Sequence, residues 1–309
     1  MICREPDRLA DFYEAAFRFT PTGEVSINEP ALAELVRIPG ATARVVTLQL
    51  GEQEIGLAGI RPPGHSYPRN VPGPSPLFQH CAIVVSDMAA AYERLSGQAD
   101  WNTISPDGPQ VLPASSGGVT AYKFRDPEGH PLELLAFARD TIPARWQNFS
   151  AGGCLGIDHS AISIADTRRS VKFYEWLGLS CIGSSLNCGP EQDRLDGIAE
   201  AFVEVTAMAL PINTTPHVEL LCYRGRRARE WALPNTNDVA ATRLVLAVDN
   251  HETLQALCAQ CSDALLSGPV RFENGAMRAM VRDPDGHVLC LEAACNESFP
   301  KLNRDAAVT

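Results

Sequence analysis

The sequence predicts an α+β protein built from four βαβββ modules, and three observations lead to that prediction. One phrase occurs twice, because residues 124–130 read FRDPEGH and residues 281–287 read VRDPDGH. The triplet Phe-Tyr-Glu begins at residue 12 and again at residue 173. Each half then divides into two stretches that pair one helical pattern with several strand patterns. An internal repeat of this length indicates the architecture before any single residue is interpreted.

Module three shows the pattern most clearly. Residues 157–164 have the apolar pattern of a strand, and Asp166 can cap a helix that runs over residues 167–177 and ends at Gly178. Three further strands are predicted near residues 180–185, 201–210 and 217–223.

The other modules follow the same order. In module two, strands are predicted at 80–85, 120–124 and 132–137, with a helix at 87–95. In module four, strands are predicted at 243–248, 276–282 and 288–293, with a helix at 251–265. In module one, a helix is predicted at 7–17 and strands at 43–50 and 54–58, while most of the first strand would precede Met1.

Stretches rich in turn-forming or polar residues separate the modules, at residues 61–76, 140–153 and 224–238. We therefore expect a first domain at residues 1–139, holding modules one and two. A second domain, holding modules three and four, is expected at residues 154–297. The basic run at residues 224–229 is interpreted as part of a solvated linker, with an anion clamp as the alternative.

Composition and net charge exclude some classes of function. Of the 309 residues, 45% are hydrophobic and 20% charged, as in globular proteins. The net charge of −11 argues against a nucleic-acid or anionic-membrane partner. The chain shows no apolar run of transmembrane length and no secretory signal. Its ten cysteines follow no disulfide-framework spacing, so we expect a cytoplasmic protein.

Four such modules, with Asp-Pro-Glu-Gly or Asp-Pro-Asp-Gly turns before the last strands of modules two and four, resemble the vicinal oxygen chelate superfamily. That superfamily includes glyoxalase I, extradiol dioxygenases and bleomycin resistance proteins. The resemblance implies that paired modules curl into two open-barrel clefts. It also implies a divalent metal ion, held by side chains from the first and last strands.

Modules two and three keep both expected ligand positions. The first-strand position is His80 in one module and His159 in the other. The fourth-strand position is Glu133 within Leu-Glu-Leu, and Glu219 within Val-Glu-Leu. A carboxylate within an apolar strand is costly unless it is paired or binds a metal. We therefore predict one metal set, comprising His80, Glu133, His159 and Glu219, between modules two and three.

Modules one and four lack the same residue types. The corresponding positions hold Arg243 and Cys290 in module four and Gly56 in module one, whose first position would precede Met1. We call the predicted cleft of modules two and three the inner cleft, and that of modules one and four the outer cleft. The outer cleft is expected to lack a metal site.

Two imidazoles and two carboxylates suit zinc, nickel, manganese, cobalt or iron, with positions left for substrate or water. The expected partner is a small-molecule substrate, with neither nucleic acid nor membrane involved. The expected state is a monomer or a homodimer, because the fused halves supply an interface internally and exposed sheet edges could equally support a dimer.

Further candidates flank the ligands. His217 shares a strand face with Glu219 and is a candidate proton shuttle. His130 and His287 follow the turn glycines and are interpreted as structural. The candidates for substrate contact are Ser163, Tyr122 or Lys123, and Asn187, Gln192 and Arg194 in a polar loop that has no recognised counterpart in the other modules.

The first hypothesis for the reaction is a glyoxalase-type lyase or isomerase. Glu133 or Glu219 would abstract a proton from a hydroxy-carbonyl substrate while the metal stabilises the developing charge. An extradiol-type dioxygenase using Fe²⁺ is the second hypothesis, with a triad drawn from modules two and three. A non-catalytic ligand-binding resistance protein is the third.

Overall fold

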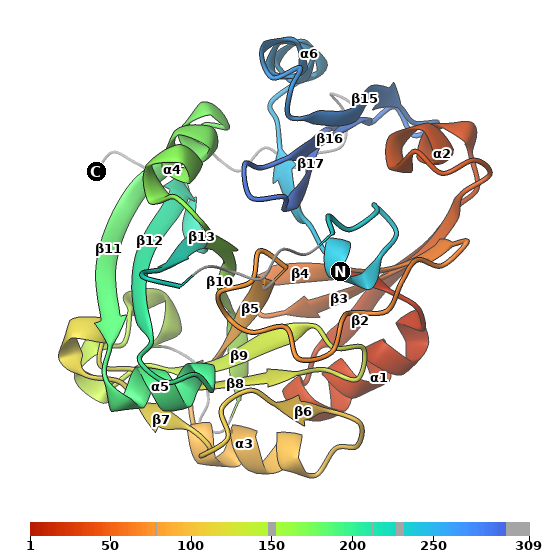
Figure 1. The fold of residues 1–309 in the computed structure, drawn as a ribbon. Helices are drawn as coiled ribbons and strands as arrows, with labels where there is room; N and C mark the ends of the chain where they lie inside the picture. The colour runs from red at the N-terminus through yellow and green to blue at the C-terminus, as the bar shows by residue number, and fades with distance from the viewer. Residues whose placement is uncertain (78, 148–152, 212, 227–231, 295–309) are drawn as a thin grey trace, which may run out of the picture.

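The computed structural model describes residues 1–77, 79–147, 153–211, 213–226 and 232–294. It confirms an α+β fold of four modules, in each of which the first strand pairs in parallel with the last. Two four-stranded sheets and one nine-stranded sheet result, and none is closed into a barrel. Figure 1 shows the four modules in chain order, from red to blue.

Module one forms a four-stranded sheet in the order β1-β4-β3-β2. Its first strand is present but short. The elements are β1 (Ile2–Cys3), α1 (Pro6–Phe17), β2 (Thr20–Ile27), α2 (Pro30–Val36), β3 (Thr42–Leu50) and β4 (Gln53–Arg61).

Modules two and three share one nine-stranded sheet, because β5 and β10 pair in antiparallel fashion. Module two comprises β5 (Gln79–Val85), α3 (Met88–Ser96), β6 (Asn102–Thr103), β7 (Gln110–Val111), β8 (Thr120–Arg125) and β9 (Pro131–Ala136). Module three comprises β10 (Cys154–Ile164), α4 (Thr167–Trp176), β11 (Ser180–Cys188), α5 (Pro190–Asp196), β12 (Phe202–Leu210) and β13 (Asn213–Tyr223).

Module four forms the sheet β14-β17-β16-β15. Its elements are β14 (Leu244–Ala247), α6 (His251–Gln260), β15 (Leu265–Arg271), β16 (Met277–Arg282) and β17 (Val288–Ala293). The helix ends earlier than the predicted residue 265, because β15 begins there. Short 3₁₀ turns complete the chain at Arg139–Thr141, Ala144–Trp146, Ala114–Ser116 and Val239–Ala241.

Three apolar cores hold these modules together. One packs module one against module two and includes Phe17 and Phe124, and a second packs module three against module four and includes Tyr174 and Val281. The third core joins the outer modules through residues such as Leu35 and Val270. Accordingly, α2 of module one lies against β15 of module four (Figure 1).

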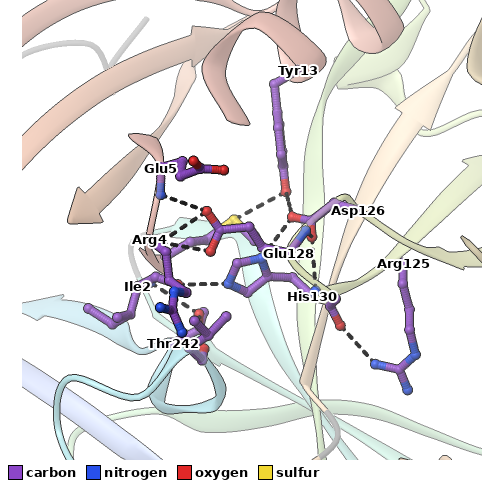
Figure 2. Close-up of polar contacts among 12 residues, drawn as sticks. Ile2, Arg4, Glu5, Tyr13, Arg125, Asp126, Glu128, His130 and Thr242 are labelled. Atoms are coloured by element: carbon purple, nitrogen blue, oxygen red, sulfur yellow. Dashed lines mark hydrogen bonds and ion pairs between the residues drawn. The ribbon is translucent and has the colours of Figure 1, made fainter. Parts of the chain in front are cut away.

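The two repeated turns, within residues 124–130 and 281–287, form hydrogen bonds between neighbouring modules. At the first turn, Tyr13 of α1 donates a hydrogen bond to Asp126, and His130 lies 2.8 Å from both the Asp126 carboxylate and the Ile2 carbonyl oxygen. The Glu128 carboxylate accepts bonds from backbone N–H groups of module one (Figure 2). The geometry agrees with the interpretation of His130 as a structural residue.

The second turn repeats this arrangement between modules three and four. Tyr174 donates to Asp283 at 3.3 Å, and Nε2 of His287 lies 2.8 Å from the Ser163 carbonyl oxygen. Asp285 accepts from the Ala165 backbone N–H, as Glu128 does at the first turn. Gly129 and Gly286 close the turns with φ of +95° and +105°, which a residue with a β-carbon adopts only with strain.

None of the described helices is long and apolar enough to cross a membrane. Of the basic run at residues 224–229, residues 227–229 lie outside the described part of the chain. Arg224 pairs with Glu204, and Arg226 bonds the Ala199 carbonyl oxygen.

Candidate metal centre

The strand register brings the four predicted ligands to one face of the nine-stranded sheet. Glu133 on β9 lies opposite Ala82 of β5, two residues after His80. Glu219 on β13 lies opposite Ala161 of β10, two residues after His159. Because side chains alternate along a strand, each histidine projects on the same side as the glutamate of its own module. The β5–β10 pairing then brings the two modules together, with His80 opposite Ala161.

The ligand atoms of His80, Glu133 and His159 all lie within 4.8 Å of one another. His80 Nε2 is 3.1 Å from Glu133 Oε2, and His159 Nε2 is 3.5 Å from Glu219 Oε2. The imidazole centroids of the two histidines are 5.6 Å apart. His80, Glu133 and His159 are buried, whereas the Glu219 side chain is 22% exposed.

Burial and charge act in opposite directions on these groups. Burial lowers the pKa of His80. Burial also opposes protonation of His159, but Glu219 and Asp158 outweigh it and raise the pKa of His159 to about 9. For Glu219, burial favours the neutral acid, yet His159 and His217 outweigh it and lower the pKa to about 2. Glu133 has a lowered pKa because His80 and Lys123 outweigh its burial.

Two further groups surround His159. Its Nδ1 lies 3.1 Å from Asp158 Oδ2, which leaves Nε2 directed at the cluster. His217 Nε2 lies 3.6 Å from Glu219 Oε1, and its ring centroid is 5.3 Å from that of His159. The atoms of Asp158, His159 and His217 form a second possible group for a metal. An acidic partner on the far nitrogen of a metal-binding histidine fixes its orientation and raises its basicity.

The cluster lies in a cavity of about 320 Å³ between β8–β9 of module two and β10–β13 of module three. Lys123, the cross-strand partner of Glu133, faces it, and Nζ is 3.9 Å from Glu133 Oε2. Nζ is also 2.7 Å from Asp196 Oδ1, at the end of α5. The cavity thus combines the ligand cluster with a buried ion pair that links the two modules.

The remaining substrate-contact candidates divide into two groups. Lys123, Asn187 and Gln192 line the cavity. Tyr122 faces the opposite side, where it packs against Phe124 and Tyr92.

Two other candidates, Ser163 and Arg194, do not line the cavity, contrary to the prediction. Ser163 is buried and donates to the Gly73 carbonyl oxygen, and Arg194 bonds the Gln110 side chain. Neither is among the described residues that line the cavity. The parity rule placed Ser163 on the face of His159 but could not show that the linker containing Gly73 covers that part of β10.

The sequence did not indicate that Asp158 and Asp196 belong to the site. Asp158 lines the cavity beside His159 although adjacent strand residues normally face opposite sides. An irregularity between Ile157 and His159 in the β10–β5 pairing accounts for this. Asp196 was missed because nothing in the sequence indicated that α5 reaches β8.

The polar segment of residues 187–194 does have a counterpart, so that expectation was wrong. It forms the end of β11 and most of α5, and module one has the equivalent helix α2 between β2 and β3. Both helices begin with a proline, Pro30 and Pro190, a residue favoured at the first helical position.

The same register identifies the equivalent positions of the outer cleft. Cys290 lies opposite Val245, two residues after Arg243, as Glu133 lies opposite Ala82 two residues after His80. Arg243 cannot bind a cation. Among the described residues, neither candidate metal group includes a residue of module one or module four.

The inner residues fit a divalent cation. His159 Nε2 is buried without a hydrogen-bond partner, and Glu219 faces it at 3.5 Å. A buried polar atom of this kind is unusual unless a ligand or ion satisfies it. Two imidazole nitrogens and two carboxylates are a common donor set for first-row transition metals.

Comparison with known proteins shows which proteins this chain resembles in sequence and fold. Residues 1–134 match the model of the Glyoxalase/Bleomycin resistance protein/Dioxygenase superfamily. Glyoxalase I from Zea mays has a similar fold, with a TM-score of 0.59 and 18% identity over 94% of this chain and 88% of that one. Residues 1–134 are therefore similar to this superfamily, and the chain as a whole has a glyoxalase-type fold.

A second similar structure is a putative dioxygenase from Bacillus subtilis subsp. subtilis str. 168, with a TM-score of 0.54 and 13% identity. The match covers 94% of this chain and 82% of that one. No curated protein matches the sequence. Identities this low establish the glyoxalase-type fold, and the reaction has to be argued from the site itself.

Proposed function

We propose that the chain is a divalent-metal-dependent lyase or isomerase of glyoxalase type. Its substrate would be a small hydroxy-carbonyl compound bound in the inner cleft. The observation that carries the proposal is the convergence of two histidines and two glutamates in one cavity. The equivalent positions of module four hold an arginine and a cysteine, so the fold alone does not require the ligand residues.

His80, Glu133, His159 and Glu219 would hold the ion. When bound, a divalent metal supplies Lewis acidity, which acidifies the C–H bond next to a carbonyl group. Lys123, Asn187 and Gln192 line the same cavity and would contact the substrate. The cavity volume of about 320 Å³ lies at the lower end of the range for small-molecule sites and suits a compact substrate.

Glu219 is the better placed of the two candidate bases. Its side chain is 22% exposed, against 8% for Glu133, whose carboxylate is held between His80 and Lys123. Glu219 would accept the proton, and the C–H electron pair would move toward the carbonyl oxygen. The hydroxyl proton then passes to that oxygen, and return of the abstracted proton to the former carbonyl carbon completes an isomerisation. His217, 3.6 Å from Glu219, is positioned to pass the proton on.

A ring-cleaving dioxygenase is the second candidate, and one observation favours it. The three atoms that lie within 4.8 Å of one another come from two histidines and one glutamate. Two histidines and one carboxylate are the ligand set typical of non-haem Fe²⁺ oxygenases. The nature of the bound metal separates the two candidates.

The first test is the metal content of the purified protein, measured by mass spectrometry beside a His80→Ala/His159→Ala double variant. We expect about one transition-metal ion per chain in the wild type and none in the double variant, since the variant loses two of four ligands. Zinc, nickel or manganese would favour lyase or isomerase chemistry, whereas iron would favour the dioxygenase.

Cys290→Ala is the matched control, because it changes the outer position equivalent to Glu133 and should leave the metal content unchanged. Absence of metal from the wild type, even after reconstitution, would refute both enzyme proposals. It would leave the third hypothesis, a metal-free small-molecule-binding protein.

A further inference from the structure

The outer cleft contains a cavity of about 600 Å³, which is larger than that of the inner cleft. Strands of module one form one side and β14, β16 and β17 of module four form another, while residues of β5 and β10, including His80 and Ser160, complete the lining. Much of its lining is apolar, and two of the valines, Val25 and Val245, are 53% and 60% exposed. Exposed apolar side chains gathered around a cavity mark a binding surface more often than chance exposure does.

A cation lies among these apolar groups. Arg243 lines the cavity at the position that holds a metal-binding histidine in the inner modules. Its guanidinium donates to Met280 Sδ at 3.1 Å and to the Thr236 carbonyl oxygen, and both acceptors are uncharged. No carboxylate lies within ion-pair distance of it among the residues that the structure describes. Burial lowers the pKa of Arg243 to about 10, which leaves it charged at neutral pH.

The other charged groups of the cavity limit what could neutralise Arg243. Arg278 is already paired with Glu292 at 2.8 Å, and Glu52 lies 3.8 Å from Arg145. Glu54 is exposed at the start of β4. Three carboxylates around one cavity disfavour a doubly charged ligand such as a phosphate monoester, whereas a single carboxylate matches the fork of one guanidinium.

We propose that the outer cleft is a second ligand site, which binds a small organic monocarboxylate. The carboxylate pairs with Arg243, and the apolar part of the ligand lies against the valines of β2, β3 and β14. The anchor Arg243 and these valines come from modules one and four, and His80 is a lining residue of both the outer and the inner cavity.

Isothermal titration of the full-length protein with hexanoate tests the proposal, with hexanamide as the uncharged probe of similar size. We expect hexanoate to bind and hexanamide to bind at least about tenfold more weakly, as loss of one charge-assisted pair predicts. Arg243→Met should weaken hexanoate to the level of hexanamide, while Arg243→Lys should give an intermediate affinity.

Two further variants locate the bound probe. Val45→Trp fills the outer cavity from β3 and should abolish binding of hexanoate while Arg243 stays in place. Glu219→Ala alters only the inner cleft and should leave the affinity unchanged. Val45→Trp and Arg243→Lys also keep the test decisive if Arg243→Met does not fold.

Three results would overturn the proposal. The first is equal affinity for hexanoate and hexanamide, and the second is wild-type affinity in Arg243→Met or Val45→Trp. The third is an absence of hexanoate binding to the folded wild type at millimolar concentrations. Loss of binding in Glu219→Ala would instead assign the probe to the inner cleft, and would equally contradict the site described here.

Discussion

At the residue scale, His159 is the centre of the candidate site. Asp158 lies at one ring nitrogen and Glu219 at the other, while the His80 and His217 rings flank it. Such an arrangement fixes both the ring plane and the nitrogen that faces the cluster. Burial lowers the pKa of His80, whereas neighbouring carboxylates raise the pKa of His159 to about 9, so the two predicted ligands differ in charge environment.

Substitution distinguishes the roles proposed for Glu133 and Glu219. Glu219→Gln should retain the metal but lower the rate of deuterium exchange into hydroxyacetone by about 100-fold or more, because the base is lost. Glu133→Gln should instead weaken metal binding and leave the exchange rate of the metal-saturated protein closer to the wild type. Exchange is followed by proton nuclear magnetic resonance in heavy water. The reverse order of effects would assign the base to Glu133.

The pH dependence of stability tests the role of His130. Burial lowers its pKa, but the Asp126 carboxylate and the Ile2 carbonyl oxygen outweigh burial and raise it above the ordinary value of 6.5. A raised pKa contributes stability that is complete below the unfolded value and is lost as pH rises through the folded value. His130→Gln should therefore lose about 1–3 kcal/mol at low pH and less at high pH.

Urea unfolding from about pH 6 to about pH 9 measures this difference. His251→Gln, at the start of α6, is the control and should keep the pH profile of the wild type. A profile for His130→Gln parallel to that of the wild type would show that folding does not change the pKa of His130, which would contradict this role.

At the element scale, the sequence predicted most strands and all four long helices, because their apolar periodicity and caps are local signals. The caps Asp87 and Asp166 accept the expected backbone bonds, from Ala90 and Arg169. The helix α5 was not predicted, since it is only seven residues long and rich in polar groups. Its role depends on a long-range contact with β8, which no local pattern contains.

That contact includes the buried Lys123–Asp196 pair. Asp196 also accepts hydrogen bonds from Gln192 and Tyr223. Because both donors are neutral, Lys123 balances the negative charge of Asp196. Lys123→Met should lower the free energy of unfolding by about 3–5 kcal/mol, because it leaves a buried carboxylate uncompensated. Lys123→Met/Asp196→Asn should recover much of that loss.

Urea unfolding at a fixed metal concentration gives the free energies of unfolding of the wild type, Lys123→Met, Asp196→Asn and the double variant. Strictly additive losses in the double variant would mean that the two side chains do not depend on each other, which would contradict the pairing.

At the scale of the whole molecule, the repeat was enough to predict that modules two and three meet and that His80, Glu133, His159 and Glu219 converge. The modules repeat within one chain, so His80 and His159 have an equivalent position in module four, which holds Arg243. The contents of the outer cleft could not be predicted in the same way. Its cavity depends on how two separate sheets face each other, and Arg243 could be recognised as an anchor only once its neighbours were known.

The continuous sheet of modules two and three has a consequence for how the chain can change. The halves are joined by backbone hydrogen bonds between β5 and β10, and not only by the covalent connection from β9 to β10. This pairing also sets the spacing between His80 and His159, which lie on the two paired strands. A substitution that shifted the register by one residue would therefore turn one histidine away from the other.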